Sequence, residues 1–142
     1  MAGSTEAVTQ LWLDANVILR FLTKDPPEMA ERSARLMAKA ERGEVSLYIS
    51  LLVLAEVVWV LKSFYRYSMA AIADVIISLV SAPGIEIDNR ELIIRAVELA
   101  HDRNVDFADA HLALQAAERG ERVCTFDESD FRRLPVEWTV PE

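Results

Sequence analysis

The chain has 142 residues and a hydrophobic content of 52%, which suits one folded domain with a real core and argues against disorder. Its net charge of −8 argues against nonspecific nucleic-acid binding through bulk charge, although clustered acids are compatible with an enzyme that acts on nucleic acid. The single cysteine, Cys124, excludes an internal disulfide and is expected to be a buried thiol in a reducing compartment. We expect residues 1–10 to form a flexible extension and residues 11–142 to form a single domain.

Apolar runs and turn residues predict strands that alternate with helices along the chain. In chain order, the predicted elements are a strand at 11–13, helices at 16–22 and 25–42, a strand at 46–49, helices at 50–65 and 68–80, a strand at 85–87, helices at 89–103 and 106–119, a strand at 122–126, a helical turn at 129–133 and an edge strand at 137–140. Several helix starts are marked by capping residues, namely Asp25, Ser50, Ser68 and Asn89. This order predicts an α/β fold, a three-layer α/β/α sandwich around a central, mainly parallel sheet of four to five strands.

An apolar run at 45–61 has a single charge, Glu56. It is marginally long for a membrane span, and a carboxylate near its centre would be costly there. The run is better explained as a strand followed by a helix, so we expect no contact with a membrane.

Four acidic residues stand in strongly apolar sequence: Asp14, Glu56, Asp109 and Asp127. Carboxylates are rarely buried unless they are paired or bind a cation, because desolvating them is costly. Asp14 and Asp127 follow strands at their carboxyl ends, where open α/β sheets bind ligands. Glu56 and Asp109 lie in helices that adjoin such strands. We therefore expect the four acids to converge on one crevice and to bind a hard divalent cation.

Some of these acids also have structural explanations. Asp14 can cap the helix that follows it, and Glu56 can pair with a distant arginine. Asp106 resembles the N-cap of the helix that carries Asp109, whereas Asp130 is expected to cap a helix or to face solvent. Thr125 is placed to hydrogen-bond a ligand carboxylate, although an ordinary strand threonine is an equal alternative. The secondary site candidates are Asp106, Asp130, Asn16 and Thr125.

Basic residues near the first acid are candidates for holding an anionic substrate, namely Arg20 and Lys24. A second basic set follows one face of the next helix and comprises Arg32, Arg35, Lys39 and Arg42. Glu28 and Glu31 precede Arg32 and Arg35 by four residues, so solvated ion pairs are the preferred interpretation of that set. The two histidines, His101 and His111, lack an evident partner and are expected on helix surfaces.

Four segments in this order, LDANVILRFL, ISLLVLAEVVWVL, DFADAHLAL and CTFDESDF, resemble the PIN-domain nucleases. The similarity is closest to the VapC-type toxins of type II toxin–antitoxin pairs, and it covers the chain from about Leu11 onward. The resemblance implies that Asp14, Glu56, Asp109 and Asp127 are catalytic and bind Mg²⁺ or Mn²⁺. Many relatives have Thr or Ser after the first aspartate, where this chain has Ala15, so one supporting hydroxyl is absent.

The resemblance further implies a cytoplasmic endoribonuclease toxin that leaves 5′-phosphate and 3′-hydroxyl ends on RNA. It also implies a homodimer and a cognate antitoxin that blocks the acidic site. Two alternatives stay open: a PIN ribonuclease of ordinary RNA processing, and a noncatalytic PIN-fold interaction module. An aspartyl phosphatase is disfavoured because the segment Asp14-Ala15-Asn16 lacks the second acid of a D-x-D motif.

Overall fold

The computed structural model describes residues 8–142, in which strands and helices alternate as predicted. Its elements are β1 (Thr9–Trp12), α1 (Ala15–Thr23), α2 (Pro27–Glu41), β2 (Val45–Tyr48), α3 (Leu51–Ser63), α4 (Met69–Val80), β3 (Ile85–Glu86), α5 (Arg90–Arg103), α6 (Phe107–Glu118), β4 (Val123–Cys124), α7 (Glu128–Phe131) and β5 (Trp138–Thr139). Most of the predicted extension, residues 1–7, lies outside the described residues. Thr9 and Gln10, which the prediction also assigned to the extension, belong to β1.

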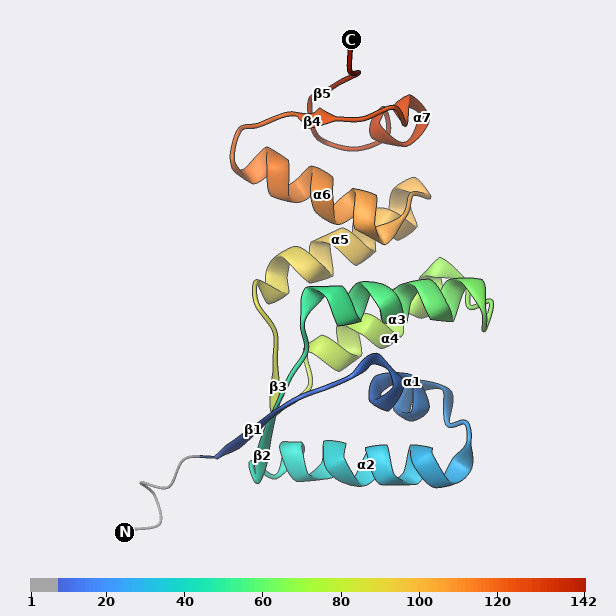
Figure 1. Cartoon of the computed structure of the whole chain (residues 1–142), viewed down its shortest axis with the longest axis vertical. Coiled ribbons are helices and arrows are strands. Elements are labelled where there is room, and N and C mark those ends of the chain that lie inside the picture. The colour runs from blue at the N-terminus through green and yellow to red at the C-terminus, as the bar shows by residue number, and fades with distance from the viewer. Residues whose placement is uncertain (1–7) are drawn as a thin grey trace.

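Every strand pair within residues 8–142 is parallel, which confirms the predicted α/β class. The strands form a three-stranded sheet in the order β1-β2-β3 and a separate pair, β4-β5. The predicted sheet of four to five strands is therefore divided, and β4 and β5 have two residues each. Figure 1 shows the three-stranded sheet beside α2 and α3, and the β4-β5 pair at the opposite end of the molecule, beyond α6.

Side-chain caps set several helix boundaries where the sequence predicts them. The hydroxyl oxygen of Ser50 accepts a hydrogen bond from the Val53 amide at 3.2 Å, and that of Ser68 accepts one from the Ala71 amide at 3.1 Å. These bonds satisfy amides that the first turn of a helix leaves unpaired. The predicted cap at Asp25 is wrong, because α2 begins one residue later in the Pro-Pro pair and has Pro26 at its N-cap without a side-chain hydrogen bond.

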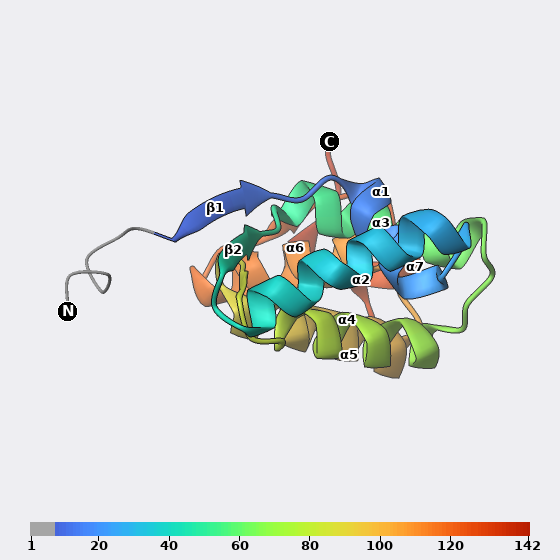
Figure 2. The ribbon, with the colours of Figure 1, turned by 90° about the horizontal axis from the view of Figure 1, so that it is seen from below.

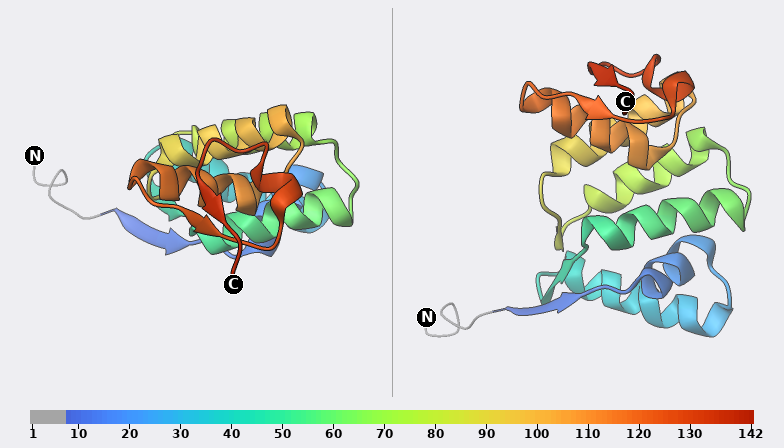
Figure 3. Two further views of the ribbon diagram at one scale, coloured as in Figure 1. Left: turned by 90° about the horizontal axis from the view of Figure 1, so that it is seen from above. Right: turned by 45° about the horizontal axis from the view of Figure 1, so that its top comes forward.

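The helices pack in a series from α2 through α1, α3, α4 and α5 to α6. Helices α1, α3, α4 and α5 and strand β2 contribute most of the largest fully buried side chains, which include Ile18, Leu47, Leu54, Ile76 and Ile93. Figure 3 shows that α7 and the β4-β5 pair cover one end of this series, over α6. No helix within residues 8–142 is long and apolar enough to cross a membrane.

A tight corner connects α4, β3 and α5. Gly84 has a φ of +82°, a conformation that L side chains rarely adopt, and a Cβ at this position would lie 2.7 Å from the Cβ of Ala40 in α2. The Arg90 guanidinium donates hydrogen bonds to the Val80 carbonyl at 2.7 Å and to the Ile85 carbonyl at 2.8 Å. One side chain thus joins the end of α4 to β3.

Several large apolar side chains remain exposed. Trp12 in β1 is 65% exposed and stacks on Tyr48 with ring centroids 4.0 Å apart. Figure 2 shows β1 extending beyond the helices, and one of its edges pairs with β2 while the other carries no strand within the described residues. The apolar stretch of α3 and α4 is divided: Ile72 is fully buried, whereas Trp59 and Phe64 are 66% and 74% exposed.

Candidate metal centre

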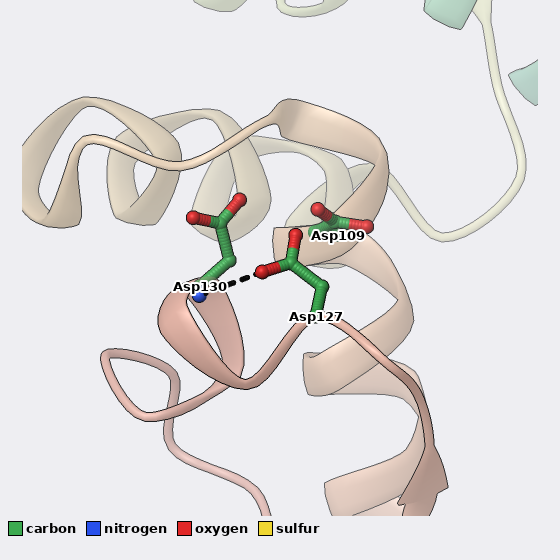
Figure 4. Close-up of side chains that lie close together, drawn as sticks. All are labelled: Asp109, Asp127 and Asp130. Atoms are coloured by element: carbon green, nitrogen blue, oxygen red, sulfur yellow. Dashed lines mark hydrogen bonds between the residues drawn. The ribbon is translucent and has the colours of Figure 1, made fainter. Parts of the chain in front are cut away.

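Three carboxylates form a compact acidic group at the end of the molecule that carries β4. Asp109, Asp127 and Asp130 each offer an oxygen atom, and these oxygens all lie within 4.8 Å of one another. Figure 4 shows Asp127 and Asp130, from the segment after β4, facing Asp109 on the first turn of α6. Residues that are 18 positions or more apart in sequence therefore meet because α7 folds back over the start of α6.

Local hydrogen bonds hold the acidic group in place. The Thr125 hydroxyl oxygen accepts a hydrogen bond from the Asp127 amide at 2.8 Å. The Asp127 carboxylate, at the N-cap of α7, accepts one from the Asp130 amide at 3.1 Å. Thr125 thus fixes the backbone of an acidic residue, whereas the sequence left a bond to the carboxylate and an ordinary strand position as equal alternatives.

A neighbouring arginine offsets part of the charge. The Arg133 guanidinium pairs with the Asp130 carboxylate at 2.5 Å and also donates to the Arg103 carbonyl at 3.3 Å. These contacts connect α7 to the end of α5. Asp109 and Asp127 have no ion-pair partner within residues 8–142, so two of the three carboxylates are free for a cation.

The acidic group and partial burial act together on the Asp109 carboxyl. Partial burial, followed by repulsion from Asp106, Asp130 and Asp127, raises the pKa of the Asp109 carboxyl above its usual range. Both effects disfavour the negative charge, and a divalent cation with oxygen ligands would relieve them. The donor set consists of oxygens alone, which fits Mg²⁺ or Mn²⁺ better than softer metals.

Replacing Asp109 with Asn is expected to raise the melting temperature of the metal-free protein at neutral pH. The folded chain holds the Asp109 proton more tightly than the unfolded chain, so stability falls as the pH rises through the raised pKa. The gain from Asp109→Asn should therefore disappear as the pH falls below the ordinary carboxyl range. Thermal unfolding in EDTA, from neutral pH to below the ordinary carboxyl range, measures the gain in melting temperature. The exposed Asp102→Asn variant is the control. An equal gain at every pH would contradict the proposed cause.

The other two predicted ligands lie outside the acidic group of Asp109, Asp127 and Asp130. Asp14 is exposed and caps α1, with one carboxylate oxygen accepting from the Ala15 amide at 2.8 Å. Glu56 is exposed on α3 and lines a hollow of about 460 Å³ together with Asn16 and Arg20. Among the described residues, the structure thus brings together Asp109 and Asp127, and it places Glu56 near the helix that Asp14 begins.

The remaining secondary candidates have clear structural positions. Asp106 is the N-cap of α6, as predicted, but its carboxylate makes no cap hydrogen bond and instead pairs with Lys62 at 3.3 Å. Lys24 ends α1 in a left-handed conformation. Arg20 and Asn16 lie one helical turn apart in α1 and line the same hollow as Glu56.

Several expectations about burial are wrong. Asp130 belongs to the acidic group and its side chain is only 23% exposed, whereas the sequence suggested a cap or a solvent-facing residue. His111 is buried, and burial lowers its pKa, although a surface position was predicted. Cys124 is exposed because β4 has one neighbouring strand and little cover. The apolar surroundings of Glu56 in sequence do not bury it, since α3 leaves that face open.

Sequence reasoning gave Asp130 too little weight and did not consider its partner Arg133. The signal was present as the spacing Asp127-x-x-Asp130, because residues three apart lie on one face of a helical turn. The same spacing relates Asp130 to Arg133. A single turn of helix after a strand therefore suffices to gather these charges.

Parallel strands, alternating helices and a three-carboxylate group define an α/β domain with a candidate site for a divalent cation. Comparison with known proteins places this domain more narrowly. The PIN domain family matches residues 11–137, and the chain belongs to this family. PIN domains are generally nucleases that use divalent metals.

One similar solved structure is that of VapBC2 from Rickettsia felis bound to a DNA fragment from its promoter. The matched chain is 18% identical in sequence, and the alignment covers 94% of the present chain and 100% of the matched chain. Its TM-score is 0.36. No curated protein matches the chain.

Proposed function

We propose that the chain is a Mg²⁺- or Mn²⁺-dependent endoribonuclease that acts in the cytoplasm as the VapC-type toxin of a toxin–antitoxin pair. The acidic group of Asp109, Asp127 and Asp130, in a chain that belongs to the PIN family, is the observation that carries the nuclease proposal. The toxin proposal rests on the sequence resemblance, whose four segments occur in order.

The proposed ligand set is Asp14, Glu56, Asp109 and Asp127, with Asp130 as the alternative fourth acid. Asp14 follows β1 and Asp127 follows β4, and each of these strands has an edge without a neighbour in the described residues. Parallel pairing of β4 with β1 would place both strand ends, and hence both carboxylates, on the same side of one sheet. We propose that the active form contains this pairing.

The pairing predicts a change in hydrogen exchange. Amides of β1 that do not bond to β2 should exchange more slowly once Mg²⁺ and RNA are added, because β4 would then accept their hydrogen bonds. Strand β3, the other edge of the same sheet, provides the internal control and should not change. Unchanged exchange throughout β1 would contradict the pairing.

The chain's own residues have distinct roles in the proposed reaction. Thr125 fixes the backbone at Asp127, and Asp127 in turn orients the start of α7, so Asp127 and Asp130 are held beside Asp109. The raised pKa of Asp109 makes ion binding compete with protons at that carboxylate. A bound divalent ion would activate water and offset charge on the phosphodiester. We propose that the products carry 5′-phosphate and 3′-hydroxyl ends.

One experiment tests the activity directly. The purified chain, freed of any partner, is incubated with total RNA in Mg²⁺, in Mn²⁺ and in EDTA, and the RNA ends are mapped. Internal cleavage with either metal and none in EDTA is expected. Absence of metal-dependent cleavage would reject the enzyme and favour the noncatalytic alternative.

The same proposal includes a homodimer and a cognate antitoxin. Exposed apolar residues in and just after α3 supply surface for such contacts, since Leu52, Trp59 and Phe64 are 82%, 66% and 74% exposed. Light scattering of the purified chain tests for the homodimer. Co-purification with the product of an adjacent gene tests for the antitoxin.

A further inference from the structure

A basic pocket lies between α1 and α2, away from the acidic group. It has a volume of about 470 Å³ and is lined by Asn16 and Arg20 from α1 and by Arg32 and Ser33 from α2, with apolar side chains between them. No acidic side chain among residues 8–142 lines it. Two arginines without an acid are notable in a chain whose net charge is −8.

Both arginines have unused binding capacity. Neither Arg20 nor Arg32 forms an ion pair within residues 8–142. The Nε–H of Arg20 is buried and has no hydrogen-bond acceptor among the described atoms. A buried donor without a partner is costly, and an anionic oxygen is the acceptor that a guanidinium prefers. Glu31, the acid next to Arg32 in sequence, is already paired with Arg35 at 3.0 Å.

The pocket adjoins the hollow that contains Glu56. Asn16 and Arg20 line both spaces, so Arg20 lies between the pocket and a proposed metal ligand. A polyanion that places one phosphate near Glu56 would carry a neighbouring phosphate toward Arg20 and Arg32. The pocket is also large enough for a phosphate with its sugar.

We propose that the pocket between α1 and α2 is a subsite for a backbone phosphate of the RNA substrate, bound by Arg20 and Arg32. This inference rests on the proposed ribonuclease function and adds the position of the substrate strand. It differs from the sequence interpretation, which assigned Arg32 to a row of solvated ion pairs and chose Arg20 with Lys24. The structure leaves Arg32 unpaired among the described residues and places it beside Arg20, whereas Lys24 does not line the pocket.

RNA binding in EDTA tests the subsite without cleavage. A short, fluorescein-labelled single-stranded RNA is titrated with the wild-type chain and with Arg20→Gln, Arg32→Gln and Arg35→Gln variants at several salt concentrations. Each pocket variant should weaken binding about tenfold and lower the slope of log affinity against log salt by about 0.7, the value for one phosphate of a single strand. Arg35→Gln removes the same charge from a paired site and should change neither quantity.

The outcomes separate the subsite from the enzyme. Loss of affinity in the pocket variants supports the subsite even if the wild-type chain cleaves no RNA, in which case only the proposed function fails. Pocket variants that bind like Arg35→Gln would overturn the subsite, whether or not the chain cleaves RNA. An acidic peptide that competes with RNA and depends more strongly on Arg20 and Arg32 would also overturn it, because the pocket would then serve a protein partner. A partial loss in Arg20→Lys, which keeps the charge but removes Nε, would confirm the role of that donor.

Discussion

Replacing Asp14 with Asn is expected to reduce metal-dependent RNA cleavage by at least about 100-fold, because a lost carboxylate ligand removes several kcal/mol of charge stabilisation at the metal. Asp14 also caps α1 through the Ala15 amide at 2.8 Å. Asn caps helices about as well as Asp, so the substitution removes the negative charge and keeps the cap. The melting temperature should therefore stay near that of the wild type.

Two companion variants make this test specific. Asp14→Ala removes both the charge and the cap, so it should lose cleavage to the same extent and also lose about 1 kcal/mol of stability. Asp102→Asn changes an exposed aspartate near the end of α5 and should leave cleavage unchanged. Cleavage by Asp14→Asn at the wild-type rate would reject Asp14 as a ligand.

Replacing Gly84 with Ala is expected to destabilise the fold by more than about 3 kcal/mol, which is at the severe end for a single substitution. The added Cβ would lie 2.7 Å from both the Cβ and the carbonyl carbon of Ala40, at a φ of +82°. The backbone of α2 cannot move away without disturbing the buried Ala40, which is 1% exposed. Urea unfolding measures the loss.

Gly43 provides the matched control for Gly84. Its φ is +78°, but a Cβ there would meet nothing within 4 Å. Gly43→Ala should therefore cost only the conformational part, about 1–2 kcal/mol. If both variants lose the same stability, the contact with Ala40 does not matter and backbone conformation alone explains the effect.

Helix boundaries were predictable because they depend on a few neighbouring residues. Ser50, Ser68 and Asn89 cap α3, α4 and α5 through their own side chains, and residue type with short spacing suffices to recognise such bonds. The alternation of strands and helices also predicted parallel pairing, since a helix between two strands returns the chain in the same direction. Asp109 and Asp127 were predicted to meet, and they do.

Burial of side chains was much less predictable, because it depends on which other helices and strands pack on an element rather than on its neighbours in sequence. Glu56 and Trp59 lie in an apolar stretch of sequence, yet both are exposed on α3. The sequence predicts Cys124 at the centre of a buried strand, but β4 has two residues and pairs with one strand, β5. Asp130 is gathered into the acidic group by the fold of α7 over α6, which no local pattern reports. The position of Arg32 beside Arg20 likewise depends on how α1 packs on α2.

The contact of Arg90 with two carbonyl groups affects how the chain can be engineered. Val80 and Ile85 lie on either side of the turn that contains Gly84, and a single guanidinium satisfies both carbonyls. Opening that turn would leave the Val80 and Ile85 carbonyl oxygens without their hydrogen-bond donor. Proteases should therefore cut the turn slowly, and it should not tolerate an inserted tag. The loop between α6 and β4, where Gly120 has open space around it, is the better point for an inserted tag.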